Sequence, residues 1–460
     1  MALKLFIIAT VVLAGAVTVA SCPPTDREAL LAFRSALHEP YLGIFNSWSG
    51  YDCCHNWYGV SCDPETRRVA DINLRGESED PIFERAGRTG YMTGTISPAI
   101  CKLRRLSSII IADWKGISGE IPTCITSLPF LRILDLIGNK LSGPIPAGIG
   151  RLQRLTVLNV ADNLISATIP SSLTRISTLT HLDLRNNRIS GELPRDFGRL
   201  GMLSRALLSR NQFSGTIPSS ISNIYRLADL DLSLNRFSGQ IPASLGKMAV
   251  LSTLNLDGNL ISGQIPITLI NSAVSILNLS RNALDGEIPD AFGQGSYFTS
   301  LDLSYNKLRG PIPKSMAGAA YIGHLDLSHN HLCGRIPGGS PFDHLEASSF
   351  VYNDCLCGKP LRACWVEKEK RKKKKLDIGI VMSLVSSKWF GQNANGMYWI
   401  VLNIVNIFSF PYVFYSINLS ILQHTYFNGR FTFYFILFFT YLVDNIVHEW
   451  KVRLFARKFG

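Results

Sequence analysis

The chain has 460 residues, of which 46% are hydrophobic and 17% are charged, a balance that excludes wholesale disorder. Its formal net charge of +12 lies mostly near the C-terminus, because residues 366–375 carry +5 and residues 376–460 carry +3. The first 365 residues therefore hold only +4, which argues against a nucleic-acid-binding body.

The first twenty residues predict a secretory signal peptide. Lys4 supplies the positive start, Leu5–Val17 form the apolar stretch, and Thr18-Val19-Ala20 provide small residues for cleavage. A membrane anchor is the alternative, but the apolar run is short and leads straight into Cys22. We therefore expect residues 1–20 to be removed and the mature chain to be secreted.

Residues 22–66 predict an N-terminal cap that begins with a helix. Thr25 and Glu28 have the spacing of a capping box, in which a side chain satisfies the first free backbone amides. The apolar residues that follow at helical spacing are Leu30, Phe33 and Leu37. We expect this apolar face to close one end of the structure.

Two irregular segments precede a regular pattern. Val69–Leu74 predicts a strand, and the polar insertion Arg75–Thr89 follows it. The second segment, Leu103–Pro122, carries Trp114 near the place where later copies have an asparagine, and it contains one extra residue.

From Leu128 onward the chain repeats every 24 residues, with one step of 23. The copy Leu128–Pro146 shows the frame Leu-x-x-Leu-x-x-Leu-x-Leu-x-x-Asn-x-Leu-Ser-Gly-x-Ile-Pro. The recurring asparagines are Asn139, Asn163, Asn187, Asn211, Asn235, Asn259, Asn282, Asn306 and Asn330. Including the irregular copies, the pattern predicts a solenoid of about ten to eleven coils over residues 67–337.

Each position of the frame has a physical reason. Leu-x-Leu alternates with period two, so each coil contributes a short strand with inward leucines, and stacked coils align these strands in one parallel sheet. A buried asparagine after the strand can satisfy backbone groups that the turn leaves without partners. Gly permits unusual backbone angles, and Pro ends strand pairing on the outer side, where short 3-10 or helical segments are expected. Ala167 replaces this Gly in one coil, which the pattern does not explain.

The side chains between the inward leucines predict a concave recognition surface. A first row contains Ile133, Val157, His181, Arg205, Asp229, Thr253, Ile276, Ser300 and His324. A second row contains Asp135, Asn159, Asp183, Asp231, Asn255, Asn278, Asp302 and Asp326. The residues that we predict to contact a partner are His181, Asp183, Arg185, Arg205, Arg210, Asp229, Asp231, Thr253, Asn255, Asp257, Asp302, His324 and Asp326. Their mixed charges favour a protein partner over a polyanion.

No set of residues predicts catalysis, a metal site or a cofactor, so we expect a protein that is not an enzyme. The second-row carboxylates should lie on a solvated sheet with nothing to shift their pKa values. His324, His329 and His331 lie near Cys333 and raise the question of a metal site. Their predicted places on strands and turns that face solvent favour the simpler surface role.

One glycosylation sequon, Asn278-Leu279-Ser280, lies in the repeats. A glycan on Asn278 would cover the C-terminal half of the concave face and direct a partner toward Arg185, Arg205 and Asp229. The alternative is that Asn278 stays bare as an ordinary member of its row.

After the last repeat, residues 338–365 predict a C-terminal cap. The polybasic run 366–375 follows this cap. Residues 376–460 form an apolar, aromatic tail that shares nothing with the repeats. Three interpretations compete: a membrane anchor within residues 398–443, a soluble extra domain, and a reading frame that is not native. We favour the third, because Phe, Ile, Asn, Tyr and Lys have A/T-rich codons. The lysines also precede the apolar stretches, whereas they should follow a span.

The motifs outside the frame resemble known proteins. These motifs are Trp48, Asp52-Cys53-Cys54, Trp57, Gly59–Cys62, Leu74–Pro81, Ala112–Lys115 and Ser204–Asn211. Over residues 20–364 the chain resembles plant DNA-damage-repair/toleration leucine-rich-repeat proteins, and more broadly the plant leucine-rich-repeat proteins similar to polygalacturonase inhibitors. The resemblance implies a plant-type arc with disulfide-bonded caps. The ten cysteines of the chain also fit an oxidising compartment, in which disulfides persist.

The pairs that the resemblance implies are Cys22–Cys53, Cys54–Cys62, Cys333–Cys355 and Cys357–Cys364. Cys101 and Cys124 fall in consecutive coils, an offset compatible with a bridge across one coil spacing. The resemblance by itself implies no biochemical activity. Together with the signal peptide and the concave surface, it favours an extracellular, cell-wall recognition protein in defence or stress, which binds a protein partner such as a wall-degrading enzyme or a receptor. A membrane-tethered receptor-like protein is the alternative, and nucleic-acid binding in damage tolerance is the third hypothesis.

Overall fold

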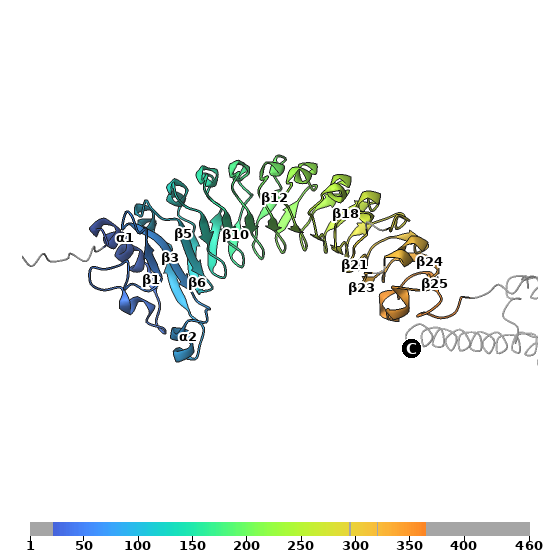
Figure 1. Cartoon of the computed structure of the whole chain (residues 1–460), viewed down its shortest axis with the longest axis horizontal. Helices are drawn as coiled ribbons and strands as arrows, with labels where there is room; N and C mark the ends of the chain where they lie inside the picture. Colours follow the sequence, from blue (N-terminus) through green and yellow to red (C-terminus); the bar gives the residue numbers. More distant parts are fainter. Residues whose placement is uncertain (1–21, 294–295, 320, 365–460) are drawn as a thin grey trace, which may run out of the picture. The chain divides into compact units, whose positions relative to one another are not determined.

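The computed structural model describes residues 22–293, 296–319 and 321–364, which lie in the compact unit Met1–Val366 (Figure 1). The predicted signal peptide (1–20), the polybasic run (366–375) and the tail (376–460), with its candidate membrane segment 398–443, lie outside the described residues. Among the described helices, none is long and apolar enough to cross a membrane.

The N-terminal cap begins with helix α1 (Pro24–Arg34). The predicted capping box is wrong, because the helix begins one residue before Thr25 and has no side-chain cap. Pro24 at the first helical position has a fixed φ and no amide hydrogen, so it starts the helix without such a cap. Leu30 and Phe33 are buried as predicted, but Leu37 lies beyond the helix in strand β1 (Leu37–His38).

Tryptophan packing completes the cap. Trp48, next to η1 (Ile44–Ser47), stacks on Trp57 with ring centroids 5.2 Å apart, and both side chains are buried. The Trp48 indole N–H donates to the carbonyl oxygen of Tyr58, so the ring is packed and its polar atom is satisfied.

The concave side of the arc is one twelve-stranded sheet (Figure 1). Strand β2 of the cap pairs antiparallel with β3, and the strands from β3 onward pair in parallel, coil to coil. These strands are β2 (Val60–Cys62), β3 (Val69–Arg75), β5 (Ser108–Ala112), β7 (Ile133–Asp135), β9 (Val157–Asn159), β11 (His181–Asp183), β13 (Arg205–Leu207), β15 (Asp229–Asp231), β17 (Thr253–Asn255), β19 (Ile276–Asn278), β21 (Ser300–Asp302) and β23 (His324–Asp326). The predicted solenoid and its parallel sheet are confirmed.

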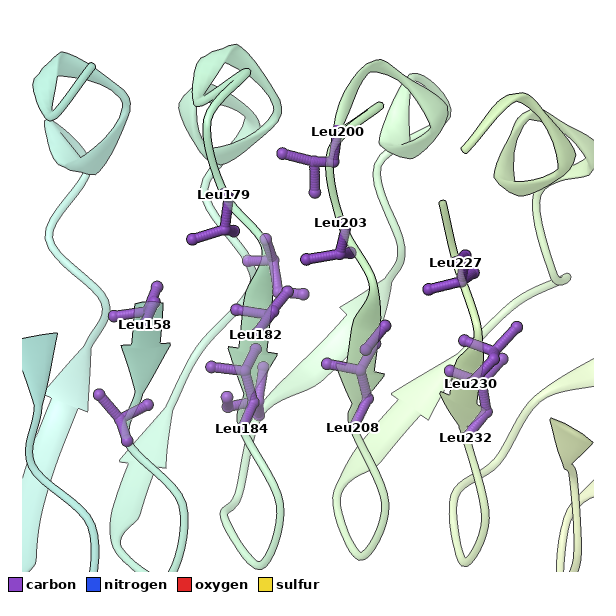
Figure 2. Packing of buried hydrophobic residues seen from close by; sticks show 14 of the residues in the cluster. Leu158, Leu179, Leu182, Leu184, Leu200, Leu203, Leu208, Leu227, Leu230 and Leu232 are labelled. Carbon is purple, nitrogen blue, oxygen red and sulfur yellow. The ribbon is translucent and has the colours of Figure 1, made fainter. Parts of the chain in front are cut away.

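Inward leucines form the core between the two sides of each coil. Leu179, Leu182 and Leu184 are fully buried, and their counterparts in the neighbouring coils occupy the same places (Figure 2). Apolar burial of this kind stabilises by about 25 cal/mol per Å². Each coil therefore depends on its neighbours to cover its leucines.

The asparagine ladder connects each coil to the coils beside it. The Asn235 amide nitrogen donates to the carbonyl oxygens of Leu208, Leu232 and Ser233 at 3.0–3.1 Å. Its oxygen accepts from the Phe213 backbone amide at 3.1 Å. One buried side chain thus satisfies four backbone groups, which explains an asparagine in every regular coil.

The ladder changes at both ends. Trp114 is fully buried and its indole N–H donates to the Leu74 carbonyl oxygen at 3.0 Å, one of the bonds that asparagine makes in later coils. Next to it, the Asn139 side-chain oxygen is buried without a hydrogen-bond partner among the described residues. Asn353 in the C-terminal cap accepts from the Leu332 amide and donates to Leu327, and it extends the ladder beyond the predicted members.

A second line of short strands was not predicted. The Leu-Ser-Gly part of the frame pairs coil to coil, because Gly takes a left-handed conformation that lets the backbone continue as a ladder. These strands are β4 (Met92–Thr95), β6 (Lys115–Glu120), β8 (Lys140–Pro144), β10 (Leu164–Ser166), β12 (Ser190–Glu192), β14 (Gln212–Ser214), β16 (Ser238–Gly239), β18 (Leu260–Gly263), β20 (Ala283–Leu284), β22 (Arg309–Gly310), β24 (His331–Arg335) and β25 (Cys355–Cys357).

Short helices form the convex side. They are η2 (Pro98–Lys102), η3 (Thr123–Ser127), η4 (Ile149–Arg151), η5 (Ser171–Arg175), η6 (Phe197–Arg199), η7 (Ser219–Asn223), η8 (Ala243–Lys247), α3 (Ile267–Ile270) and η9 (Lys314–Gly318). The C-terminal cap adds η10 (Phe342–His344) and η11 (Ala347–Ser349). The structure has the bridges that the resemblance implies, Cys22–Cys53, Cys54–Cys62, Cys333–Cys355 and Cys357–Cys364, together with Cys101–Cys124 between η2 and η3.

The polar insertion contains a short helix, α2 (Pro81–Ala86), which the Asp80 carboxylate caps by accepting from the Ile82 amide. Burial, followed by the charge of Asp80, raises the pKa of Tyr58 in the cap to about 12. The Arg88 guanidinium lies 3.6 Å from the ring centroid of Tyr41. The insertion therefore packs against the N-terminal cap.

Candidate binding surface

Strand register places the predicted first row in a continuous line across the concave sheet. His181 pairs with Arg205, which pairs with Asp229, and Asp229 pairs with Thr253 in the next coil. The same register continues through Ile276, Ser300 and His324. Because side chains alternate along a strand, these residues face away from the buried leucines.

The second row has a structural role that the sequence did not reveal. In each of its members the side-chain oxygen accepts a hydrogen bond from the backbone amide two residues later, at 2.9–3.4 Å. This is an Asx turn, which ends each strand and starts the bend. Leu207 replaces the acidic or amide residue in one coil and is buried.

The expectation that the second-row carboxylates lie on a solvated sheet is wrong for two of them. Asp135 and Asp183 are only 8% and 2% exposed. Arg75 donates to Asp135 at 3.1 Å, and the Arg185 guanidinium contacts Asp183 at 2.7 Å. Asp183 and Arg185 are therefore paired with each other.

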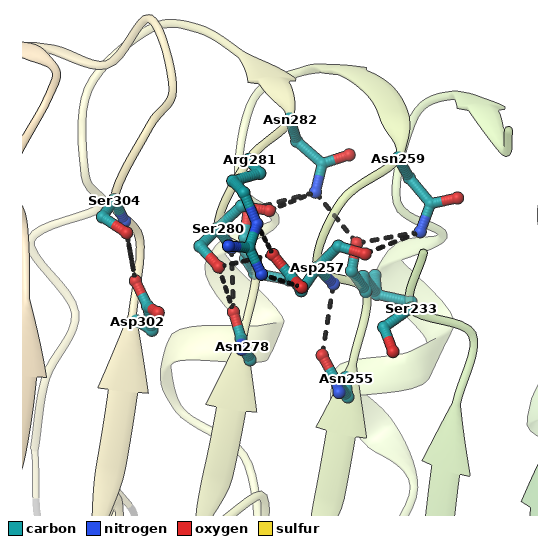
Figure 3. Close-up of polar contacts among 12 residues, drawn as sticks. Ser233, Asn255, Asp257, Asn259, Asn278, Ser280, Arg281, Asn282, Asp302 and Ser304 are labelled. Atoms are coloured by element: carbon teal, nitrogen blue, oxygen red, sulfur yellow. Dashed lines mark hydrogen bonds and ion pairs between the residues drawn. The ribbon is translucent and has the colours of Figure 1, made fainter. Parts of the chain in front are cut away.

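Asp257 and Arg281 form a second such pair. Asp257 is 5% exposed, and the Arg281 guanidinium of the next coil approaches its carboxylate at 2.5 Å (Figure 3). The buried hydroxyl of Ser280 also donates to Asp257, at 2.8 Å. Asp257, which we predicted to contact a partner, is thus mostly engaged within the solenoid.

The middle of the first row remains accessible. His181 is half-buried, Arg205 is exposed, and the Arg205 side chain lies 3.3 Å from the Asp229 carboxylate. Burial lowers the pKa of His181; Asp183 opposes this effect, whereas the charge of Arg205 adds to it. Arg210 lies outside the sheet, at an exposed turn position with a left-handed φ of 54°.

The three histidines near the C-terminal end make different contacts and do not form a common site. His324 is exposed on β23, and the imidazole of His331 lies 3.0 Å from the Asp354 carboxylate. His329 stacks between Tyr305 and Tyr352, with ring centroids 3.8 and 4.3 Å away. In the cap, the Cys53, Cys54 and Cys62 sulfurs lie within 4.8 Å of one another, but all three are bonded in disulfides.

Fold and surface together define a leucine-rich-repeat solenoid of the plant type. The leucine rich repeat N-terminal domain model matches residues 23–63. Leucine rich repeat models match residues 272–332 and residues 130–152, 178–200 and 226–248.

The chain is 65% identical over 121 residues to the DNA damage-repair/toleration protein DRT100 of Arabidopsis thaliana. The aligned residues cover 26% of this chain and 32% of that protein. It is 33% identical over 116 residues to a polygalacturonase inhibitor of Vitis vinifera, covering 25% and 30%. These findings confirm the resemblance drawn from the residues. The matched part spans about a third of the length of these relatives.

A solved structure shows the same fold. The ectodomain of the Arabidopsis thaliana receptor kinase GASSHO1/SCHENGEN3, in complex with CASPARIAN STRIP INTEGRITY FACTOR 2, is 28% identical with a TM-score of 0.63. The match covers 72% of this chain and 38% of that one. Plant leucine-rich-repeat proteins similar to this chain thus include inhibitors and receptor ectodomains.

Proposed function

We propose that this chain is an extracellular recognition protein, not an enzyme, that binds a protein partner on the middle of its concave face. One observation carries the proposal: the first-row side chains take no part in the asparagine ladder or in the turns that end the strands. The second row is used in turns and the asparagines in the ladder. His181, Arg205 and Asp229, in contrast, face outward from three adjacent strands.

The chemistry of this surface fits a folded protein or an extended peptide. Arg205 and Asp229 offer both charges within one ion pair, and His181 adds a donor and an acceptor. Mixed signs at close spacing give specificity for a complementary protein surface. The polygalacturonase inhibitors among the relatives suggest a secreted wall-degrading enzyme as the first partner to test.

The test uses the secreted full chain and a purified fungal polygalacturonase. A concave variant, His181→Ala/Arg205→Ala/Asp229→Ala, should lower binding at least tenfold, because central interface residues cost about 2 kcal/mol or more when truncated. Calorimetry or surface plasmon resonance measures the affinity, and release of reducing sugar measures inhibition.

The matched control is the convex variant Arg151→Ala/Arg175→Ala/Arg199→Ala, whose residues are exposed on η4, η5 and η6. It should bind as the original chain does. Affinity lost in the convex variant and kept in the concave variant would contradict the proposed face. No binding of the original chain to the enzyme would exclude this enzyme class as the partner.

A further inference from the structure

We infer that Asn278 carries an N-linked oligosaccharide, which divides the concave face. Asn278-Leu279-Ser280 is the only acceptor sequon among the described residues. Asn255, the member of the same row in the preceding coil, has Asp257 in place of the required hydroxyl residue. The signal is therefore confined to one coil.

The folded site leaves the reacting atom free. The Asn278 side-chain oxygen accepts from the Ser280 amide at 3.0 Å (Figure 3). It also lies 2.7 Å from the Ser280 hydroxyl oxygen, whose single proton is shared between Asn278 and Asp257. No described acceptor takes a hydrogen bond from the Asn278 amide nitrogen. Among the described residues, the only fully buried side-chain atoms without a hydrogen-bond partner are Asn139 Oδ1 and Ser244 Oγ. The Asn278 nitrogen has no described partner and is not one of these buried atoms, so it is accessible to solvent.

The surroundings have room for a sugar. The register neighbours of strand β19 are short: Thr253 and Asn255 on one side, Ser300 and Asp302 on the other. Ile276 is 43% exposed on the same strand and offers an apolar surface to the C–H face of a pyranose ring. A glycan can thus extend from the sheet without displacing a packed side chain.

The disulfides place the chain in the compartment where this chemistry occurs. All cysteines among the described residues are paired, and such bonds persist in an oxidising environment such as the endoplasmic reticulum lumen. There a lipid-diphosphate-linked oligosaccharide is the donor. The Asn278 amide nitrogen bonds to the anomeric carbon of its first sugar, the bond from that carbon to the diphosphate oxygen breaks, and the nitrogen loses one proton. The lipid diphosphate is the leaving group.

A glycan at this place has a consequence for recognition. It would stand over β17 to β21 and cover the first-row positions of those strands. The part of the face that stays open is the N-terminal half, which contains His181 and Arg205. The modification itself does not depend on the proposed function, and it can be tested without a partner.

The experiment is site-resolved glycopeptide mapping of the full chain secreted from plant cells. We expect the peptide that contains Asn278 to carry an oligosaccharide whose core has two N-acetylglucosamines. Mapping by peptide separates this site from Asn418, whose sequon Asn418-Leu419-Ser420 lies outside the described residues. Recovery of the Asn278 peptide in unmodified form alone would overturn the inference.

Two variants make the result specific. Asn278→Asp removes the acceptor amide but keeps the turn, since Asp302 makes the same bond in the next coil. It should be secreted with an unchanged unfolding midpoint and should lack the glycan. Ser280→Thr keeps the hydroxyl and should keep the modification. A glycan mass that persists at this peptide in Asn278→Asp would also overturn the assignment.

Discussion

At the scale of single residues, stability depends on amide and carboxylate side chains that take the place of missing backbone partners. Each ladder asparagine makes bonds that no apolar residue of similar size can make. Second-row residues such as Asp302 do the same at strand ends through one side-chain oxygen. Both roles recur in most coils, so a substitution at one position tests a role that the other coils share.

We expect Asn235→Leu to destabilise the solenoid. The change leaves the backbone groups of Phe213, Leu208 and Leu232 without their partner, and each buried unsatisfied group costs about 1–3 kcal/mol. Denaturant unfolding followed by circular dichroism measures the loss. Asn223→Leu, at an exposed convex position, is the control and should stay close to the original chain. Equal midpoints for both variants would contradict the ladder.

Substitution of Ala167 by glycine should stabilise the solenoid, in contrast to the loss expected for Asn235→Leu. Ala167 has a left-handed φ of 64°, where a β-carbon costs about 1–2 kcal/mol. Replacing Ala167 by glycine removes this strain, but glycine also makes the unfolded chain more flexible, which offsets part of the gain in folding stability. Ala167→Gly should therefore stabilise by roughly 0.5–1 kcal/mol in thermal unfolding. Gly191→Ala, the same frame position one coil later with φ 79°, should destabilise. A lower midpoint for Ala167→Gly would show that this strain is absent.

The pKa of His181 predicts a pH dependence. Burial lowers it in the folded chain, and the nearby Arg205 and Arg185 add to the effect while Asp183 opposes it. The unfolded chain therefore binds a proton more readily, and stability from this group is lost as pH falls through the lowered folded value. From about pH 7 to about pH 5, the original chain should lose more stability than His181→Asn. Parallel losses in denaturant titrations at these two pH values would contradict the prediction.

At the scale of elements, the irregular coil formed by β5 and β6 lies between the regular repeats and the coil of β3 and β4, whose strands pair with the N-terminal cap. Trp114 fills its interior and replaces one asparagine bond, while the insertion that contains α2 packs on the cap next to it. An added β-carbon at Gly90, the residue that follows the insertion, would lie 2.5 Å from the Trp114 ring, so the end of the insertion passes close to this side chain. The indole thus joins two elements that no repeat pattern describes.

Trp114→Phe should destabilise this coil by about 1–3 kcal/mol, because it keeps an aromatic ring but leaves the Leu74 carbonyl oxygen without its donor. Trp114→Ala should cost more, about 3–5 kcal/mol, since it also opens a cavity. Hydrogen exchange resolved by peptide should show the loss over β3 and β5 first. Uniform loosening of all coils would contradict a local role.

At the scale of the whole molecule, stacking makes each coil the cover of the next, and the caps close both ends. The ladder, the inward leucines and the five disulfides all lie within residues 22–364. Stability in such an arrangement is the sum of contacts between neighbouring coils. The two capped ends should therefore define a unit that folds without the segment that follows it.

A chain ending at Trp365 should accordingly be secreted and unfold at the same midpoint as the full chain, within about 0.5 kcal/mol. Secretion yield, size-exclusion chromatography and denaturant unfolding measure this. Aggregation of the shortened chain, with the full chain soluble, would show that residues 366–460 contribute to the fold.

The sequence by itself determined the repeating architecture, because a 24-residue period states which residues are neighbours in adjacent coils. The inward leucines, the asparagine ladder and the first concave row follow from that period alone. The N-terminal cap was recognisable from motifs outside the frame, and the C-terminal cap from the cysteines at the end of the repeat. The period also placed Asn278 on the concave face.

Only the tertiary structure decided how the polar side chains are used. Whether Asp183 and Asp257 face a partner or pair with Arg185 and Arg281 depends on side-chain direction at a turn, which a linear pattern does not contain. The second line of strands required a left-handed residue, glycine in most coils and Ala167 in one, and the Trp114 bond required two elements to meet in space. The period fixes which coils are adjacent, whereas the packed backbone fixes which side chains remain free.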